Sequence, residues 1–386
     1  MKLAGLLDEK TRTACRAAAA IGAVTFGLGL KAAPARAMSD LLLGNVYFLG
    51  VAAFALVFLA IQILTKAGWP TLFRRVPEAM TAYLPAGAGV MVLVLAGSRM
   101  LYHWAHSEAV VHDEILHLKS GYLNLPGWAL RTAIALFAWW AFARAIKLNS
   151  LRQDTEGGLE ATERNYPLAA AYLVAFGATF TLASIDWVMS LEPHWYSTLY
   201  PWYLFSGAFV NAIAGVSVLT VLLHRRGYFP KLNEHHLHDL GKYLFGFGAF
   251  WAYLWFCQYL LIWYSNIPEE TIYYAARSTR GWMFLHLINV SLNFLIPFGL
   301  LLRAGAKKRE RALLAAGACF LVGRWVDLYI MVMPASFHGA RPSWMDAPIF
   351  IGLAAVFVLL FDRAFTNAPP EPVNDPFLVE SQHHHG

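Results

Sequence analysis

Apolar runs of about 20 residues recur from one end of the chain to the other, each long enough to cross roughly 30 Å of hydrocarbon as a helix. None shows the strict alternation of a membrane β-strand, and a helix satisfies its own backbone in lipid. Only 14% of the residues are charged, against roughly 25% in an ordinary soluble domain. We therefore predict an all-α integral membrane protein in which residues 1–386 form a single membrane domain. The ten predicted spans are residues 14–30, 42–64, 80–102, 127–146, 166–190, 198–223, 240–264, 282–302, 311–333 and 347–365.

Lysine and arginine are concentrated near the N-terminus and in alternate loops, such as "RRGYFPK" at 225–231 and "RAGAKKRER" at 303–311. Because such loops stay on the cytoplasmic side, we predict a multi-pass protein with both termini cytoplasmic and a cytoplasmic tail at 366–386. The net charge of +6 is then an orientation signal, and no nucleic-acid partner is expected. Asp8 and Glu9 dilute the positive charge typical of a cleaved signal peptide, so we expect the first span to be retained.

Two halves of the chain share short sequence patterns. The segments "IDWVMSLEP" at 185–193 and "VDLYIMVMP" at 326–334 each place an aspartate before a proline at the end of a span. The fourth and eighth spans begin with matching Gly-Trp pairs, in "PGWALR" and "RGWMFLH". We predict two parallel-repeated four-helix bundles, at 42–190 and 198–333, with the spans at 14–30 and 347–365 as peripheral helices.

The repeated aspartates, Asp186 and Asp327, are predicted to lie inside the membrane near its periplasmic face. An ionised carboxylate there costs several kcal/mol unless it is paired. The repeat sets Arg131 at the depth of Asp186 and His286 at the depth of Asp327, and Arg324 lies on the same helical face as Asp327. These five residues are candidates for proton transfer or for a quinone site. The alternative, that they are structural locks between helices, is left open by the sequence.

A second group of titratable residues falls in the predicted periplasmic loops: His103, His106, Glu108, Glu192 and His194. We interpret this group as a solvated, titratable surface. The nearby stretch "HDEILH" is not a metal-binding helix motif, because its two histidines are five residues apart rather than four. No metal site is therefore predicted.

Redox centres held by metal ligation are not expected in this chain. An iron–sulfur cluster needs clustered thiolates, but Cys15, Cys257 and Cys319 lie far apart in separate spans. A membrane haem uses paired axial histidines on facing helices, and only His286 lies well inside a span.

Three long segments carry a resemblance to a known family: "IDWVMSLEPHWYSTLYPWYLFSGAFV", "HDLGKYLFGFGAFWAYLWFCQYLLIWYSNIPEET" and "RWVDLYIMVMPASF". Together with the length and the ten spans, they resemble the F subunit of alternative complex III. This complex is a quinol:cytochrome c oxidoreductase of the bacterial inner membrane, in respiratory or photosynthetic chains. The subunit belongs to the NrfD-like, polysulfide-reductase type of membrane subunit, whose core is two four-helix bundles.

The resemblance implies partners rather than a redox centre in this chain. The implied partners are a homologous quinol-binding membrane subunit, a periplasmic iron–sulfur subunit, cytochrome c-type subunits with haem c, and lipids. The resemblance also allows a terminal oxidase as a further partner. This subunit would support assembly, and whether it also binds quinone or transfers protons is left open. Two alternatives are a purely structural membrane anchor of the complex and a secondary transporter. The parallel repeat argues against transport, because transporter repeats usually have inverted topology.

Overall fold

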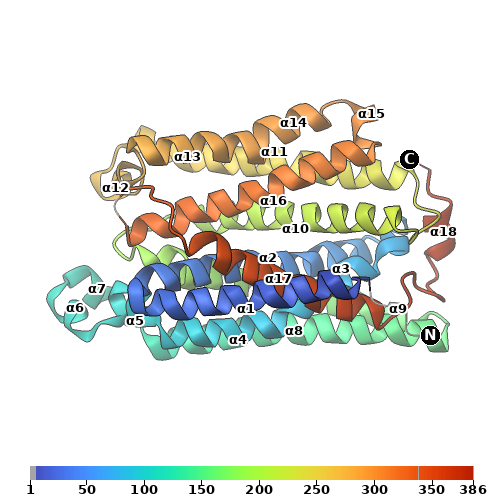
Figure 1. Cartoon of the computed structure of the whole chain (residues 1–386), viewed down its shortest axis with the longest axis horizontal. Helices are drawn as coiled ribbons and strands as arrows, with labels where there is room; N and C mark the ends of the chain where they lie inside the picture. The colour runs from blue at the N-terminus through green and yellow to red at the C-terminus, as the bar shows by residue number, and fades with distance from the viewer. Residues whose placement is uncertain (1–5, 338, 386) are drawn as a thin grey trace.

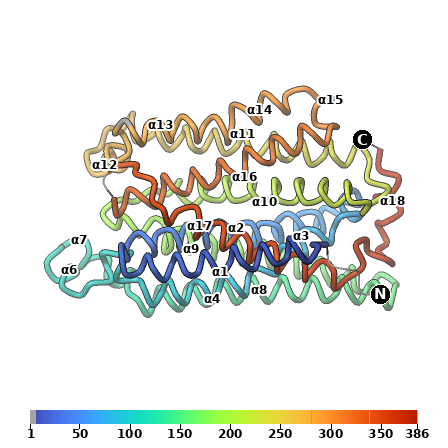
Figure 2. Tube along the Cα trace, in the orientation of Figure 1, coloured from blue at the N-terminus to red at the C-terminus, as the bar shows by residue number. Residues whose placement is uncertain are grey.

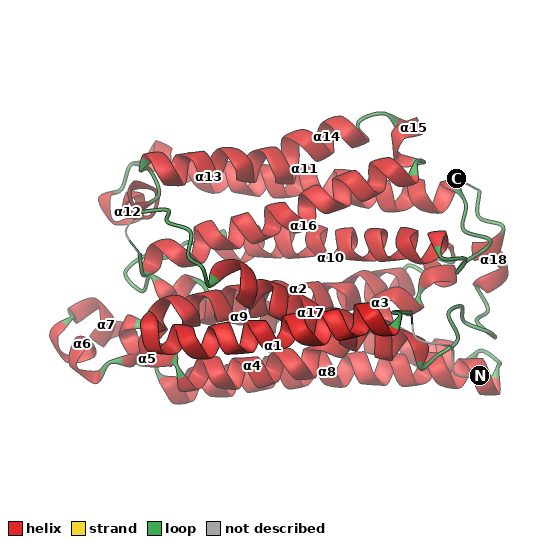
Figure 3. Cartoon of the chain, viewed as in Figure 1, coloured by secondary structure: helices red, strands yellow, loops and turns green. Residues whose placement is uncertain are grey.

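The computed structural model of the chain describes residues 6–337 and 339–385, and throughout these ranges the regular secondary structure is helical (Figure 3). Ten helices or helix runs in the described part are long and apolar enough to cross a membrane, which confirms an all-α membrane fold. They are α1 (Glu9–Ala32), α2 (Pro34–Leu64), α3 with α4 (Arg75–Met80, Leu84–Ala96), α8 (Leu125–Glu156), α9 (Glu160–Trp187), α10 (Tyr200–Arg225), α11 (Glu234–Ser265), α13 with α14 (Arg280–Val290, Ile296–Leu301), α16 (Glu310–Val332) and α17 (Asp346–Thr366).

The long helices run side by side, and α2 and α10 lie at their centre (Figure 1). These two are the most deeply buried spans, and they pack against each other. In the first half, α2 packs on α4 and α9, and α8 packs on both α4 and α9. In the second half, α10 packs on α11 and α16, and α16 packs on α13 and α14. The remaining spans, α1 and α17, pack together and against α2. Each half is thus built around its own first helix.

The two ends of the molecule differ. The first and last described residues and the short helix α18 (Leu378–Gln382) lie at one end, here named the terminal end (Figure 2). The opposite end, here named the loop end, carries four short helices: α5 (Ser98–Leu101), α6 (Ser107–His112), α7 (Glu114–Lys119) and α12 (Pro268–Ala276). The other short helical segments are η1 (Trp69–Phe73), η2 (Thr81–Tyr83), η3 (His103–Ala105), η4 (Met189–Leu191), η5 (Ser291–Leu295), α15 (Ala304–Lys307) and η6 (Met333–Ala335).

Two of the predicted spans are not continuous α-helices. The third is interrupted by η2, which ends two residues before Pro85, and the eighth contains the π-helical turn η5, which ends two residues before Pro297. A proline has no N–H to donate to the carbonyl four residues earlier, so the turn before it relaxes from α-helical geometry. The turn at η5 bears on the site, because it contains Asn293.

Candidate functional site

Asp186, at the loop end of α9, forms a bidentate ion pair with Arg131 of α8. The Arg131 Nε lies 2.7 Å from one carboxylate oxygen and its Nη2 lies 3.0 Å from the other. The guanidinium also lies 3.9 Å from the centre of the Tyr122 ring and donates to the Tyr122 carbonyl at 3.0 Å. Burial, aided by the Asp186 charge, raises the pKa of the Tyr122 phenol to about 12. The pairing that the repeat predicted for Asp186 is therefore present.

Asp327 of α16 is fully buried and accepts hydrogen bonds from four side chains. Arg324 Nη1 donates at 2.6 Å and Asn289 Nδ2 at 2.9 Å. Trp251 Nε1 donates at 3.2 Å, and the Tyr203 hydroxyl donates to the same oxygen as Asn289. Each carboxylate oxygen thus accepts two hydrogen bonds, which replace those that water would make.

Two glycines make room for this second cluster. A Cβ on Gly207 of α10 would overlap the Arg324 guanidinium, and a Cβ on Gly323 of α16 would lie 2.7 Å from Asn293 Nδ2. Asn293 in turn donates to the side-chain oxygen of Asn289 at 2.6 Å. A larger residue at either glycine would therefore displace Arg324 or Asn293 from this cluster.

His286 does not pair with Asp327, so that part of the prediction is wrong. His286 is the fifth residue after Gly281, whereas Arg131 is the fourth residue after Gly127, so the two side chains point about 100° apart around their helices. Asn289 of α13 bonds to Asp327 instead. His286 lines an open groove, and its buried Nδ1 has no hydrogen-bond partner among the described residues. The groove residues are Trp255, Ser278, Met283, Phe284, His286, Leu287 and Val290.

Four of the five predicted surface residues are exposed at the loop end: His103, His106, Glu108 and His194. His194 lies with its Nε2 2.6 Å from a carboxylate oxygen of Asp113. That hydrogen bond, with those from the backbone of Leu116 and Ile115, holds the pKa of Asp113 below its ordinary value. The loop therefore contains one local polar pair rather than only free charges.

Glu192 differs from the other four, because it is ion-paired with the fully buried Arg277. The Arg277 Nη2 lies 2.6 Å from one Glu192 oxygen and the Nη1 lies 3.1 Å from the other. Arg277 also donates to the carbonyls of Ile330 and Tyr273, and its guanidinium lies 3.5 Å from the centre of the Tyr273 ring. Burial raises the pKa of Tyr273 to about 12. This ion pair ties the exit of the first half to α12 and α16 of the second.

A third buried cluster joins α2 to α17 and was missed by the sequence analysis. Arg36 donates to both oxygens of Asp346, at 2.7 and 2.8 Å from Nη2, and to the Tyr329 hydroxyl at 2.6 Å. Asp40 lies one turn along α2, 3.7 Å from the Arg36 Nε. The sequence contains a pattern that could have predicted part of this cluster, because Arg36 and Asp40 are four residues apart at the start of an apolar run.

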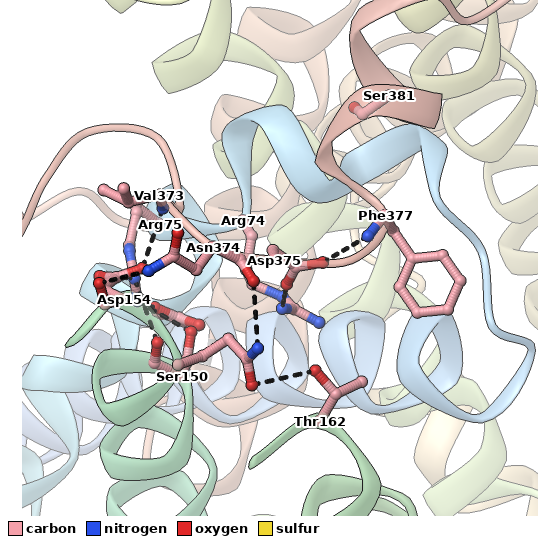
Figure 4. A network of polar contacts seen from close by, with 12 residues as sticks. Arg74, Arg75, Ser150, Asp154, Thr162, Val373, Asn374, Asp375, Phe377 and Ser381 are labelled. Carbon is pink, nitrogen blue, oxygen red and sulfur yellow. Dashed lines mark hydrogen bonds and ion pairs between the residues drawn. The ribbon is translucent and has the colours of Figure 1, made fainter. Parts of the chain in front are cut away.

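A fourth cluster lies at the terminal end, where the C-terminal segment crosses α3 and α8 (Figure 4). Arg75 pairs with Glu78 at 2.6 Å and with Asp154, and Arg74 pairs with Asp375 of the C-terminal segment. Further along this segment, Ser381 accepts from the Leu72 N–H and donates to the Trp69 carbonyl. The predicted tail is therefore folded against the helices over its described residues.

The arrangement of Asp186 and Asp327 favours a structural role. Each faces an arginine, and neither shows an unpaired carboxylate oxygen. In the described part of the chain, no three His, Cys, Asp or Glu side chains are grouped so that they could hold a metal ion. Compared with known proteins, the chain matches no family model and no curated protein sequence.

Proposed function

We propose that this chain is the F subunit of an alternative complex III, a bacterial quinol:cytochrome c oxidoreductase, and that it chiefly supports assembly of the complex in the inner membrane. The observation that carries the proposal is the repeat of a buried aspartate, paired with arginine, at the end of one helix in each half of the chain. The long aromatic segments that resemble this subunit include those two helix ends, the first part of α10 and most of α11.

An anchoring role is favoured over proton conduction through Asp186 and Asp327. A proton carrier must release its proton and exchange partners, whereas these carboxylates are held by charged hydrogen bonds from fixed side chains. Removing one partner of a buried ion pair is strongly destabilising, so both pairs resist the change of charge that conduction requires.

Exposed aromatic residues at the loop end support contact with other subunits. Trp263 and Tyr264 are 62% and 83% exposed, and Trp202 and Trp344 are more than half exposed. Aromatic residues are enriched in the cores of protein interfaces and at membrane interfaces. The partners in this proposal are the homologous quinol-binding subunit, the periplasmic iron–sulfur subunit and the cytochrome c-type subunits.

Quinone contact is a second candidate function, and the groove at His286 is the observation that favours it. The groove is mostly apolar, lies between α11 and α13, and offers one imidazole whose Nδ1 lacks a partner among the described residues. Such a site suits a molecule with an apolar tail and a hydrogen-bonding ring oxygen. His286→Leu should then lower the quinone that copurifies with the chain and leave assembly unchanged.

The proposal is tested by isolating the chain, with an affinity tag, from its native membranes in mild detergent. We expect the eluate to contain c-type haem, iron–sulfur subunits and quinol:cytochrome c reductase activity. Recovery of a stable, tagged chain with no accompanying redox subunit, under conditions that preserve other respiratory complexes, would contradict it.

A further inference from the structure

The cluster of Arg36, Asp40 and Asp346 contains more negative than positive charge. All three side chains are buried, with exposed fractions of 6%, 4% and 6%. With both carboxylates ionised, one guanidinium would face two negative charges in a membrane protein interior. The site would then carry a net charge of −1, and burying such a charge costs several kcal/mol.

The hydrogen bonds divide unequally between the two acids. Asp346 accepts from Arg36 Nε at 3.1 Å, from Arg36 Nη2 at 2.7 and 2.8 Å, and from the backbone N–H of Ser343 at 3.0 Å. Asp40 is only within 3.7 Å of the Arg36 Nε, whose single N–H is already directed at Asp346. The buried Oδ2 of Asp40 has no hydrogen-bond partner among the described residues. Asp40 is thus the acid that lacks stabilisation of its ionised form.

The other buried acids in the described part of the chain do not share this imbalance. Asp186, Asp327 and Asp362 each face one arginine, and Asp239 pairs with Lys242 and His384. The terminal-end cluster has three carboxylates, but it has two arginines and lies within electrostatic reach of Lys147. In the terminal-end cluster Arg75 donates to both Glu78 and Asp154. Among the described residues, only Asp40 lies beside a second buried carboxylate with their shared cation already bonded to that second one.

We propose that this cluster is a proton-binding site, in which Asp40 carries an exchangeable proton at neutral pH. The proton removes the surplus charge, because two adjacent carboxylates that share one cation bind a proton between them more readily than either does alone. The charged or titratable groups that face Asp40 are Arg36 on its own helix, Asp346 from α17 and the Tyr329 hydroxyl from α16. The site is independent of the proposed function.

Exchange with solvent occurs from the loop end. Asp346 begins α17 directly after a segment in which Arg341 and Trp344 are exposed. The Tyr329 hydroxyl, which accepts from Arg36, donates to the Arg341 carbonyl at 3.2 Å. Loss of the proton would set Asp40 against Asp346, so proton release should weaken the contact between α2 and α17.

Infrared spectroscopy of the purified full chain, in H₂O and in D₂O, tests the site directly. The wild type should show a carboxylic-acid C=O band at neutral pH that shifts in D₂O, and Asp40→Asn should remove that band. Asp362→Asn is the matched control, because Asp362 is equally buried but accepts hydrogen bonds from Arg12 and from the Leu7 N–H, and the second acid that pairs with Arg12, Glu9, is exposed. The control should keep the band. Absence of the band from the wild type, or its persistence in Asp40→Asn, would overturn the proposal.

Thermal unfolding gives a second, independent decision. Asparagine resembles a neutral aspartic acid but needs no proton from solvent when the chain folds, so Asp40→Asn should unfold at the same temperature as the wild type or higher at neutral pH. As pH rises above about 4, where Asp40 ionises in the unfolded chain, folding must take up a proton, so the unfolding temperature of the wild type should fall relative to that of Asp40→Asn. If Asp40→Asn fails to fold at neutral pH, Asp40 is needed in its charged form and the proposal is wrong.

Discussion

Arg324 and Asp327 lie one turn apart on α16, buried to 2% and 0% exposure. Asp327→Asn should destabilise the protein by about 3–5 kcal/mol, because it leaves the arginine buried without a counter-charge. The double variant Arg324→Met, Asp327→Asn should recover much of the loss. Glu160→Gln is the control, since Glu160 and its partner Arg164 are exposed and such pairs contribute at most about 1 kcal/mol. Unfolding by detergent titration measures the stability of all three variants. Equal losses of stability for Asp327→Asn and for Glu160→Gln would contradict a structural role for the ion pair between Arg324 and Asp327.

For single residues, the sequence predicts an ion-pair partner only where both residues stand at fixed positions in a repeated motif. Asp186 and Arg131 were paired correctly, because each stands at a fixed distance from a repeated motif. Asp327 was predicted to need a partner, but a difference of one residue in helical position directed His286 away from it. Asp346 lies more than 300 residues from Arg36, and local sequence pattern does not predict a contact at such a separation.

At the scale of the helix, α1 and α17 pack so closely that their backbones touch. A Cβ on Gly22 would lie 2.8 Å from the Cα of Gly352, a contact typical of small residues between membrane helices. Gly22→Leu should therefore separate the two helices and cost about 1–3 kcal/mol or more. Gly27→Leu, on the same helix with open space around it, should have little effect. Unfolding measurements on the pair decide, and equal stability of the two variants would contradict the close packing.

The short helix α7 should loosen in acid. Asp113 caps it by accepting from the N–H groups of Ile115 and Leu116, and its pKa is lowered chiefly by the hydrogen bond with His194. A lowered pKa stabilises the folded form above the ordinary value near 3.8, and this stabilisation is lost as pH falls through the lower, folded value. Amide exchange in α7, corrected for intrinsic rates, should accelerate below about pH 4. Asp113→Asn should keep the cap but abolish this pH dependence.

The helices themselves were predictable because their length and apolarity are properties of local sequence. All ten spans occur where they were expected, although α8 and α11 extend beyond the predicted spans into polar residues at the terminal end. Those extensions contain Gln153, Asp154 and Asp239, which the C-terminal segment contacts. Hydropathy could not find them, because their polar groups are satisfied by a distant part of the chain rather than by lipid or water.

At the scale of the whole molecule, the C-terminal segment joins three spans that are far apart in sequence. Asp375 pairs with Arg74 beside α3, Asn374 donates to the carbonyl of Asp154 on α8, and His384 lies 2.8 Å from Asp239 on α11. Asp375 is buried, so its charge contributes more than that of an exposed pair. The segment therefore acts as a strap across the terminal end, and its hold depends on the pair between Asp375 and Arg74.

Asp375→Asn should release this strap without unfolding the membrane helices. Loss of the counter-charge at Arg74 should weaken docking by about 2 kcal/mol, which raises the undocked fraction about 30-fold. Limited proteolysis measures that fraction, because cleavage after residue 366 requires the strap to open and its rate follows the open population. Glu371→Gln is the control, since Glu371 lies in the same segment and forms no ion pair with the described residues. Equal cleavage rates in the two variants would show that the strap is held by its other contacts. If the membrane helices of both variants unfold at the same rate as those of the wild type, the effect of Asp375→Asn lies in the strap alone.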